Sequence, residues 1–417
     1  MSMNVRSHTR PRWCAAAGLV FLRLAMTCCL RLPGAEPAPA AKPEKAEAKE
    51  EKEEKTDLVN SIGFSVGGAI VDGPRSQFQR RYRIGGDRPY GGLDELHLEK
   101  EISKTGVLKV DGQALIGNYD YSMKLEISEP DTGYVRAGYR QFRTWSDGTG
   151  GFDPQTAAWF PLADQVLHLD RGEAWIEAGL TLPDWPKLKL RYSHQFRDGT
   201  KDSTIWGQAA GMAVPGGRLG ITSSFWDIDE DRDIIQGDLA HKLGKTDLGV
   251  GLRYEIDRLN NGLHLNQQYK AGTITQREGQ RTTEFSAHAF TETRFNDKIL
   301  LTSGYSYTTL DTDLSGSRVF EPTVPTTPLA GFMGLTGGSA LREYVFTLNL
   351  QAMPWDNFTI VPSIRAQKQD INGMSIFANT YPVGPPEDLS AQNENDYLEV
   401  SGRLEARYTG LTNWVGC

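Results

Sequence analysis

The stretch that decides the fold is DRGEAWIEAGLTLPDWPKLKLRYSHQFR, residues 170–197. Apolar or ring-bearing side chains occupy the even positions of 174–182 and of 188–196, and the odd positions between them are mostly charged, polar or small. A period of two over this length predicts two β-strands, each with one apolar and one polar face. Pro-Asp-Trp-Pro at 183–186 predicts a turn between them. Each half has roughly 11 residues, which is long for a soluble sheet and suits a tilted strand that crosses a membrane.

The same alternation recurs along the chain and predicts about fifteen strands, the last only begun at Trp414. The expected strands are 59–70, 96–102, 107–116, 119–127, 134–142, the two halves of 170–197, then 235–243, 248–256, 285–295, 299–307, 344–352, 358–366 and 398–408. This pattern predicts an all-β fold, a large antiparallel transmembrane β-barrel that extends over residues 58–417. Because lipid does not tolerate unpaired strand edges, we expect the chain to be an incomplete copy of a longer barrel, or another segment to close it.

The connections between the expected strands are of two kinds. Short turns alternate with polar loops of roughly 25 to 35 residues, far longer than ordinary connections. The long loops are expected after Arg143, Arg197, Asp257, Leu310 and Lys368. Bacterial outer-membrane barrels have short periplasmic turns and long external loops, so the alternation predicts a location in the bacterial outer membrane, with lipid as a partner. Three tryptophans fall on the short-turn side and are candidates for an interfacial aromatic belt: Trp185, Trp355 and Trp414.

The N-terminal part of the chain has a different composition. Residues 1–35 resemble a secretory signal, with an arginine-rich start followed by an apolar segment. Residues 36–57 are mostly Glu, Lys, Ala and Pro, which predicts a disordered, solvated linker. All four cysteines lie in the leader or at the last position (Cys14, Cys28, Cys29 and Cys417), so we expect neither a disulfide framework nor a cysteine metal site.

The polar positions of the strands carry charges of both signs, as a water-filled lumen requires. The candidates for side chains that face the lumen are Lys187, Lys189, Arg191, Arg197, Arg253, Glu255, Arg403 and Glu405. No catalytic pair stands out among so many carboxylates, and we expect no enzyme activity and no metal site. The acidic run 227–233 is interpreted as a solvated loop at the start of a strand rather than a cation site. The net charge of −8 gives no support for nucleic-acid binding.

Residues 165–260 contain an order of short motifs that can be compared with known families. Arg171 and the strand after it are followed by the Pro-Asp-Trp-Pro turn, by Leu-Lys-Leu-Arg-Tyr-Ser-His at 188–194 and by Arg-Asp-Gly-Thr-Lys at 197–201. This order resembles the repeated unit of the MtrB/PioB family of large outer-membrane barrels. The resemblance implies a porin-like sheath around a periplasmic multihaem c-type cytochrome, for electron transfer across the outer membrane. It implies that haem belongs to the partner and that the barrel itself has no cofactor.

Two other functions remain open from the sequence. The mixed charges alone also fit a general or solute-specific diffusion porin. A soluble secreted β-protein that binds glycans is the third possibility, and it would require the apolar rows to be sealed inside a two-layer core.

Overall fold

The computed structural model describes residues 60–85, 89–146, 148, 151–153, 158–160, 167–208, 219–265, 272–322, 330–380 and 384–410. The chain divides into two units, Met1–Lys55 and Thr56–Cys417, and all described residues belong to the second. The expected signal segment 1–35 and linker 36–57 therefore lie outside the described residues, as does Trp414.

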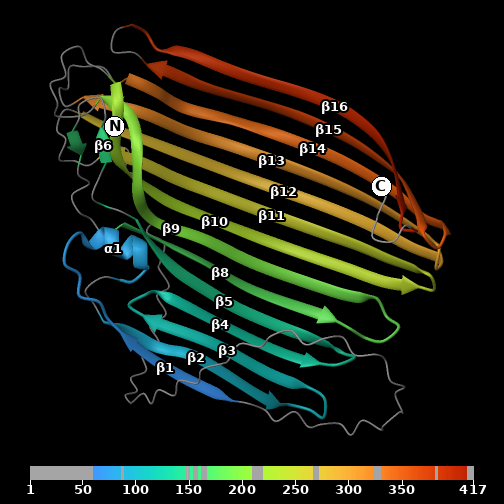
Figure 1. The fold of residues 1–417 in the computed structure, drawn as a ribbon. Helices are drawn as coiled ribbons and strands as arrows, with labels where there is room; N and C mark the ends of the chain where they lie inside the picture. The colour runs from blue at the N-terminus through green and yellow to red at the C-terminus, as the bar shows by residue number, and fades with distance from the viewer. Residues whose placement is uncertain are drawn as a thin grey trace, which may run out of the picture. The chain divides into compact units, whose positions relative to one another are not determined.

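The described part of the second unit contains one antiparallel sheet of 14 strands in chain order (Figure 1). Each strand pairs with the strand before and after it in that order, and β1 and β16 form the two edges. The strands are β1 Ser61–Gly67, β2 Tyr90–Glu101, β3 Val107–Ile116, β4 Asp120–Glu129, β5 Gly133–Ser146, β8 Leu167–Leu180, β9 Lys187–Gln208, β10 Leu219–Leu243, β11 Thr246–Leu265, β12 Gly272–Asn296, β13 Ile299–Pro322, β14 Ala330–Trp355, β15 Phe358–Thr380 and β16 Glu387–Tyr408.

Three further elements lie in the connections at one end of the sheet. The helix α1 (Arg75–Tyr82) lies between β1 and β2, and the sequence pattern did not predict it. The strands β6 (Gly151–Asp153) and β7 (Ala158–Phe160) form a separate small sheet between β5 and β8. The connections at the other end are mostly short turns. In one of them Gly244 has φ 59°, a value that two-residue hairpins require and glycine adopts without strain.

The predicted all-β fold is confirmed, and each of the fourteen complete strands expected from the sequence is present. The predicted loop lengths are wrong for the second half of the chain. There β9 runs on to Gln208 and β10 begins at Leu219, so most of the expected loop after Arg197 is paired strand, and the same holds after Asp257, Leu310 and Lys368. Beyond the apolar rows both faces of a strand are polar, so the alternation disappears while backbone pairing continues.

The apolar rows lie on one face of the sheet and are exposed. On β11, for example, Val250 and Leu252 are 47% and 51% exposed, and Leu398 on β16 is 70% exposed. Only six hydrophobic side chains are buried among the described residues. A soluble two-layer protein would seal these rows in its interior, whereas the wall of a membrane barrel turns them toward lipid. The arrangement therefore does not fit the soluble, glycan-binding alternative.

Candidate functional site on the polar face

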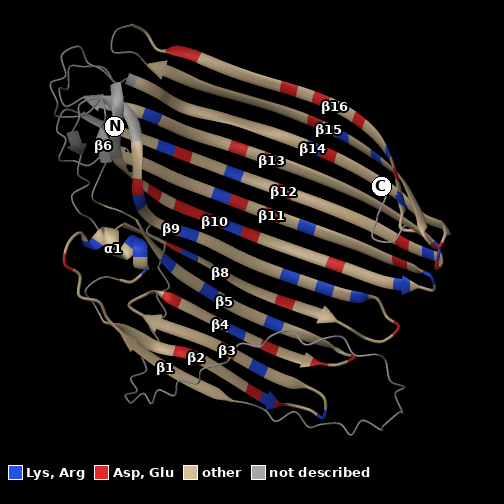
Figure 2. Ribbon diagram, viewed as in Figure 1, with Lys and Arg blue, Asp and Glu red and all other residues tan. Residues whose placement is uncertain are grey.

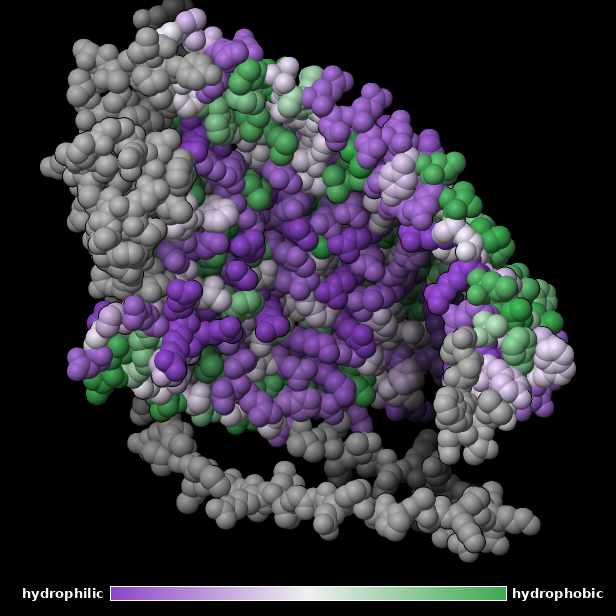
Figure 3. Space-filling view, turned by 45° about the horizontal axis from the view of Figure 1, so that its top comes forward, coloured by the Kyte–Doolittle hydropathy of each residue, from purple (hydrophilic) through white to green (hydrophobic). Residues whose placement is uncertain are grey.

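Strand register assembles one continuous polar face opposite the apolar rows. On β8 the side chain of Glu177 lies across from Arg136 on β5 and from Arg191 on β9, because these positions are direct partners in the two ladders. The same parity continues into β10 and β11, where Arg232 is paired with Asp257. In Figure 2 acidic and basic residues are interspersed along the strands, and in the view of Figure 3 hydrophilic residues predominate over the middle of the visible face.

Glu177 is the centre of the best-connected part of this face. It is 5% exposed and accepts a hydrogen bond of 3.0 Å from the Tyr134 hydroxyl. Three cations surround it, at 3.4 Å from Arg191, 3.5 Å from Lys189 and 3.8 Å from Arg136. A buried carboxylate needs such compensation, since an unpaired charge in this position would be costly.

The eight lumen candidates all lie on this polar face. Arg191 also bridges to Glu173 at 3.0 Å, Arg197 donates to Glu230 at 2.6 Å, and Arg253 pairs with Glu255. On the edge strand β16, Arg403 and Glu405 pair at 2.9 Å. Because charges of both signs are interspersed on neighbouring strands, the face is strongly polar and suits contact with water. That this face lines a lumen stays a prediction.

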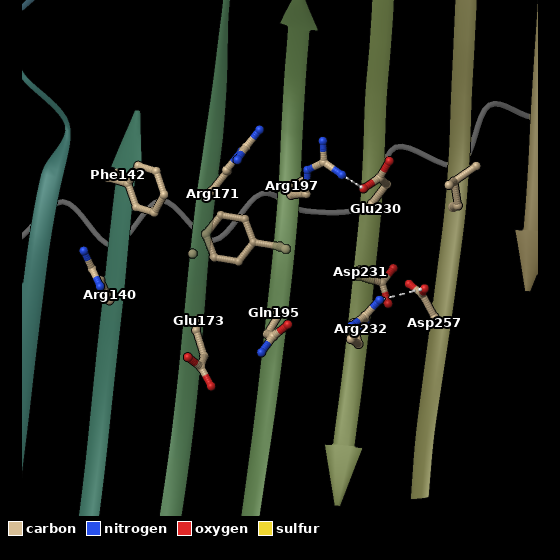
Figure 4. Close-up of a pocket in the computed structure, with 13 residues that line it drawn as sticks. Arg140, Phe142, Arg171, Glu173, Gln195, Arg197, Glu230, Asp231, Arg232 and Asp257 are labelled. Carbon is tan, nitrogen blue, oxygen red and sulfur yellow. Dashed lines mark hydrogen bonds and ion pairs between the residues drawn. The ribbon is translucent and has the colours of Figure 1, made fainter. Parts of the chain in front are cut away.

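A hollow of about 420 Å³ lies on the polar face, with its lining residues on β5, β8, β9, β10 and β11. Four arginines line it, Arg140, Arg171, Arg197 and Arg232, together with the four carboxylates of Glu173, Glu230, Asp231 and Asp257. In Figure 4 Arg171 and Arg197 project from neighbouring strands toward the same end of the strands, and Arg140 lies below them on β5. Sequence reasoning missed Arg140, Arg171 and Arg232 as members of a site. The sequence predicts that these arginines lie on the same face of their strands as Glu173 and Arg197. It does not predict the register between strands, which brings them together.

A second cluster lies on the opposite, apolar face, near the end of the rows and between Tyr192 and Phe196 on β9. Asp233 accepts hydrogen bonds from the Tyr192 hydroxyl at 2.8 Å and from Arg258 at 3.0 Å, and lies 2.9 Å from His194 Nδ1. Arg258 also pairs with Asp231. The interpretation of 227–233 as a solvated loop is therefore wrong, because this run lies inside β10 and its carboxylates are paired on both faces. His194 lies on the apolar face, as its position in the row predicted.

The described tryptophan candidates lie at the short-turn end. Trp185, in the turn between β8 and β9, is 69% exposed, and Trp355, at the end of β14, is 68% exposed. Exposed indole rings at the end of an apolar row are placed where a membrane interface favours them. Their role in an interfacial belt stays a prediction.

The described residues offer neither a metal-binding cluster nor a helix that could cross a membrane. They contain no group of three or more His, Cys, Asp and Glu side chains placed to hold a metal ion. No helix within them combines the length and the apolar character needed to cross a membrane.

A 14-stranded antiparallel sheet with an exposed apolar face and a charged opposite face defines the wall of an outer-membrane β-barrel. No family model and no curated protein matches the sequence. Among solved structures the chain is similar to the ferric yersiniabactin uptake receptor FyuA from Yersinia pestis, with a TM-score of 0.52 and 12% identity over 79% of this chain and 50% of FyuA. The open form of the ferric-catecholate import receptor Fiu from E. coli K12 gives a TM-score of 0.38 and 10% identity over 78% of this chain and 66% of Fiu.

The chain thus spans about half the length of FyuA, and at 12% identity the likeness concerns the fold alone. The fold is that of a bacterial outer-membrane β-barrel, and this fold places the chain in the outer membrane.

Proposed function

We propose that the chain forms the wall of a wide outer-membrane barrel that encloses a periplasmic multihaem c-type cytochrome, so that electrons cross the membrane through the enclosed haems. The observation that carries the proposal is the polar face, which continues from β2 to β16 with interleaved charges. Such a face suits the hydrated surface of an enclosed protein. The resemblance of residues 165–260 to the MtrB/PioB unit supplies the identity of that protein. In this proposal the barrel insulates and positions the cytochrome and performs no redox chemistry.

The width of the bore is the critical requirement. Fourteen strands about 4.8 Å apart and tilted by about 40° would close to a backbone diameter of about 28 Å, which side chains reduce further. A compact domain of about 100 residues has a radius of gyration of about 13 Å and would not fit inside. The proposal therefore requires a ring of more than fourteen strands. In the described residues β1 and β16 do not pair with each other, which is compatible with such a ring.

Co-purification tests the proposal. The full chain, expressed with an affinity tag in a host that makes c-type cytochromes, is extracted from outer membranes with a mild detergent. We expect a haem-staining protein to co-elute in fixed ratio and to remain bound at high salt. A matched preparation of an unrelated tagged outer-membrane barrel from the same host is the control. Elution of the barrel without haem above this control would overturn the sheath proposal.

A diffusion porin is the second candidate, favoured by the hollow with its four arginines on the polar face. A barrel that closes with fourteen strands would leave a water-filled bore of a size that admits small solutes. Conductance of the purified chain in planar bilayers distinguishes the two functions. A porin gives stable open-channel steps, whereas a sheath with its cytochrome in place conducts little.

A further inference from the structure

We propose that the hollow on the polar face is a binding site for an oxyanion, a phosphate or carboxylate group, held by the guanidinium groups of Arg140, Arg171 and Arg197. The inference rests on the part of the proposed function that gives this face access to water, and not on the identity of any cargo. It assigns a class of ligand to the hollow, whereas a barrel wall by itself needs no ligand.

The first observation is a direct pairing of like charges. Arg171 on β8 and Arg197 on β9 are register partners on the same face. Side chains at such positions are close neighbours, and like charges there repel each other. Other ladder positions on this face place opposite charges together, as with Arg136 and Glu177, although Glu255 and Glu284 form a like-charge pair of carboxylates. Arg171 and Arg197 form a like-charge pair of cations, and a bound anion between the two guanidinium groups would remove the repulsion.

The second observation is the distribution of carboxylates around the hollow. Glu230 accepts a hydrogen bond of 2.6 Å from Arg197, and Glu173 forms an ion pair of 3.0 Å with Arg191. Asp257 forms an ion pair of 3.2 Å with Arg232. Among the described residues neither Arg140 nor Arg171 lies in an ion pair, although both line the hollow. Asp231, the fourth carboxylate of the lining, is paired with Arg258. All four carboxylates thus have a cationic partner, and the charges of Arg140 and Arg171 are not balanced by any of them.

The third observation concerns individual donors. The Nε atoms of Arg171 and Arg197 are buried and have no hydrogen-bond partner within the described part of the chain. A buried donor of a charged group is normally satisfied, so each of these atoms requires an acceptor. An oxyanion supplies several acceptor oxygens and fits the planar guanidinium fork in a bidentate manner. The Nε of Arg136, on the same face but outside the hollow, is also without a partner among the described residues. The two donors in the hollow belong to the like-charge pair, so a single ligand would satisfy both.

The volume of the hollow indicates the size of ligand that it accepts. About 420 Å³ is well above the volume of a bare inorganic anion and lies within the range of small-molecule sites. The ring of Phe142 lines the hollow beside Arg140, and the Arg140 guanidinium lies 5.6 Å from its centroid. The site therefore suits a small organic molecule that carries a phosphate or carboxylate group and an apolar body.

Titration of the purified full chain in a phosphate-free, non-ionic detergent buffer tests the proposal, with inorganic phosphate as the probe and heat as the readout. We expect saturable binding at one site per chain. Arg171→Gln should weaken binding at least tenfold. The matched control is Arg365→Gln, which removes the same charge from the same face, where the described contact of Arg365 is a hydrogen bond of 2.8 Å to Gln367. This control should change the affinity less than twofold.

Two outcomes would overturn the proposal: a wild-type chain that shows no saturable uptake of phosphate, or Arg171→Gln and Arg365→Gln variants that bind alike. A parallel titration with acetate separates a site for phosphate from a site for carboxylates in general. Arg140→Gln on β5 repeats the test from another strand, so a folding defect of one variant does not decide the result. Because the probe is phosphate, haem co-purification can fail while this site is confirmed, and the reverse also holds.

Discussion

Leu252 provides the sharpest test of which face of the sheet meets lipid. It lies on β11 at the centre of the apolar row that runs from Leu248 to Ile256, and it is 51% exposed. Eight steps of about 3.4 Å, with a strand tilt of about 40°, give this row a height of about 21 Å, close to the apolar band of known barrels. Leu252 is therefore near the midplane of the membrane. An arginine there should cost about 2–4 kcal/mol, whereas the cost near either interface falls to about 0–1 kcal/mol.

The assay is reversible urea unfolding of the chain folded into phospholipid vesicles. We expect Leu252→Arg to lower the folding equilibrium constant roughly 30- to 900-fold. The control is Thr308→Arg on β13. Tyr307 aligns with Leu252 through Ala287, so at a tilt of about 40° Thr308 lies within about 9 Å of the height of Leu252, but it faces the polar side across from Glu343. There the new charge gains an opposite partner and should be neutral or stabilising by up to about 1 kcal/mol. Equal costs for the two arginines would refute the assignment of the faces.

Two further predictions concern the polar face and the short-turn end. Glu177→Gln should destabilise the vesicle-embedded chain by roughly 1–3 kcal/mol in the same unfolding assay, because three cations lose their shared partner. The control, Glu405→Gln on the exposed edge strand, should change stability by less than about 0.5 kcal/mol. Comparable losses would show that Glu177 has no special role. In single-tryptophan variants, lipids brominated near the headgroup should quench the fluorescence of Trp185 and Trp355 more strongly than that of Trp175, which lies on the polar face. Equal quenching of the three would contradict an interfacial position.

The strands and their faces could be predicted from the sequence because the signal is local. Alternation at Ile176 and Leu190 depends only on which side of one strand meets lipid, and every strand of the wall repeats the same rule. The class of fold follows, since rows of this length are too long for ordinary soluble sheets. The short turns were equally accessible, because residues such as Pro183 and Gly244 mark them by their own backbone preferences.

The lengths of the strands and the composition of the hollow could not be predicted in this way. Beyond Phe196 both faces of β9 carry mostly polar residues, so the period vanishes although pairing with β10 continues to Gln208. The sequence Asp227–Asp233 looks like a loop for this reason. The hollow depends on the register between β8 and β9, which places Arg171 opposite Arg197, and a shift by one residue would have separated them.

The polar cluster on the lipid-facing side indicates where the membrane ends along the strands. Beyond Tyr192, and before Phe196 in the same row, the positions along this face bring His194, Asp233 and Arg258 together in hydrogen bonds. Charges of this kind are costly in the hydrocarbon layer but are tolerated at its boundary. A 26-residue strand such as β14 extends about 65 Å along the barrel axis if tilted by about 40°, so much of its length lies beyond a band of about 25 Å. Register partners place Arg171 and Arg197 within a few residues of this boundary, on the opposite face. An anion bound there would sit near the level at which the bore leaves the hydrocarbon layer, on the side away from the short turns.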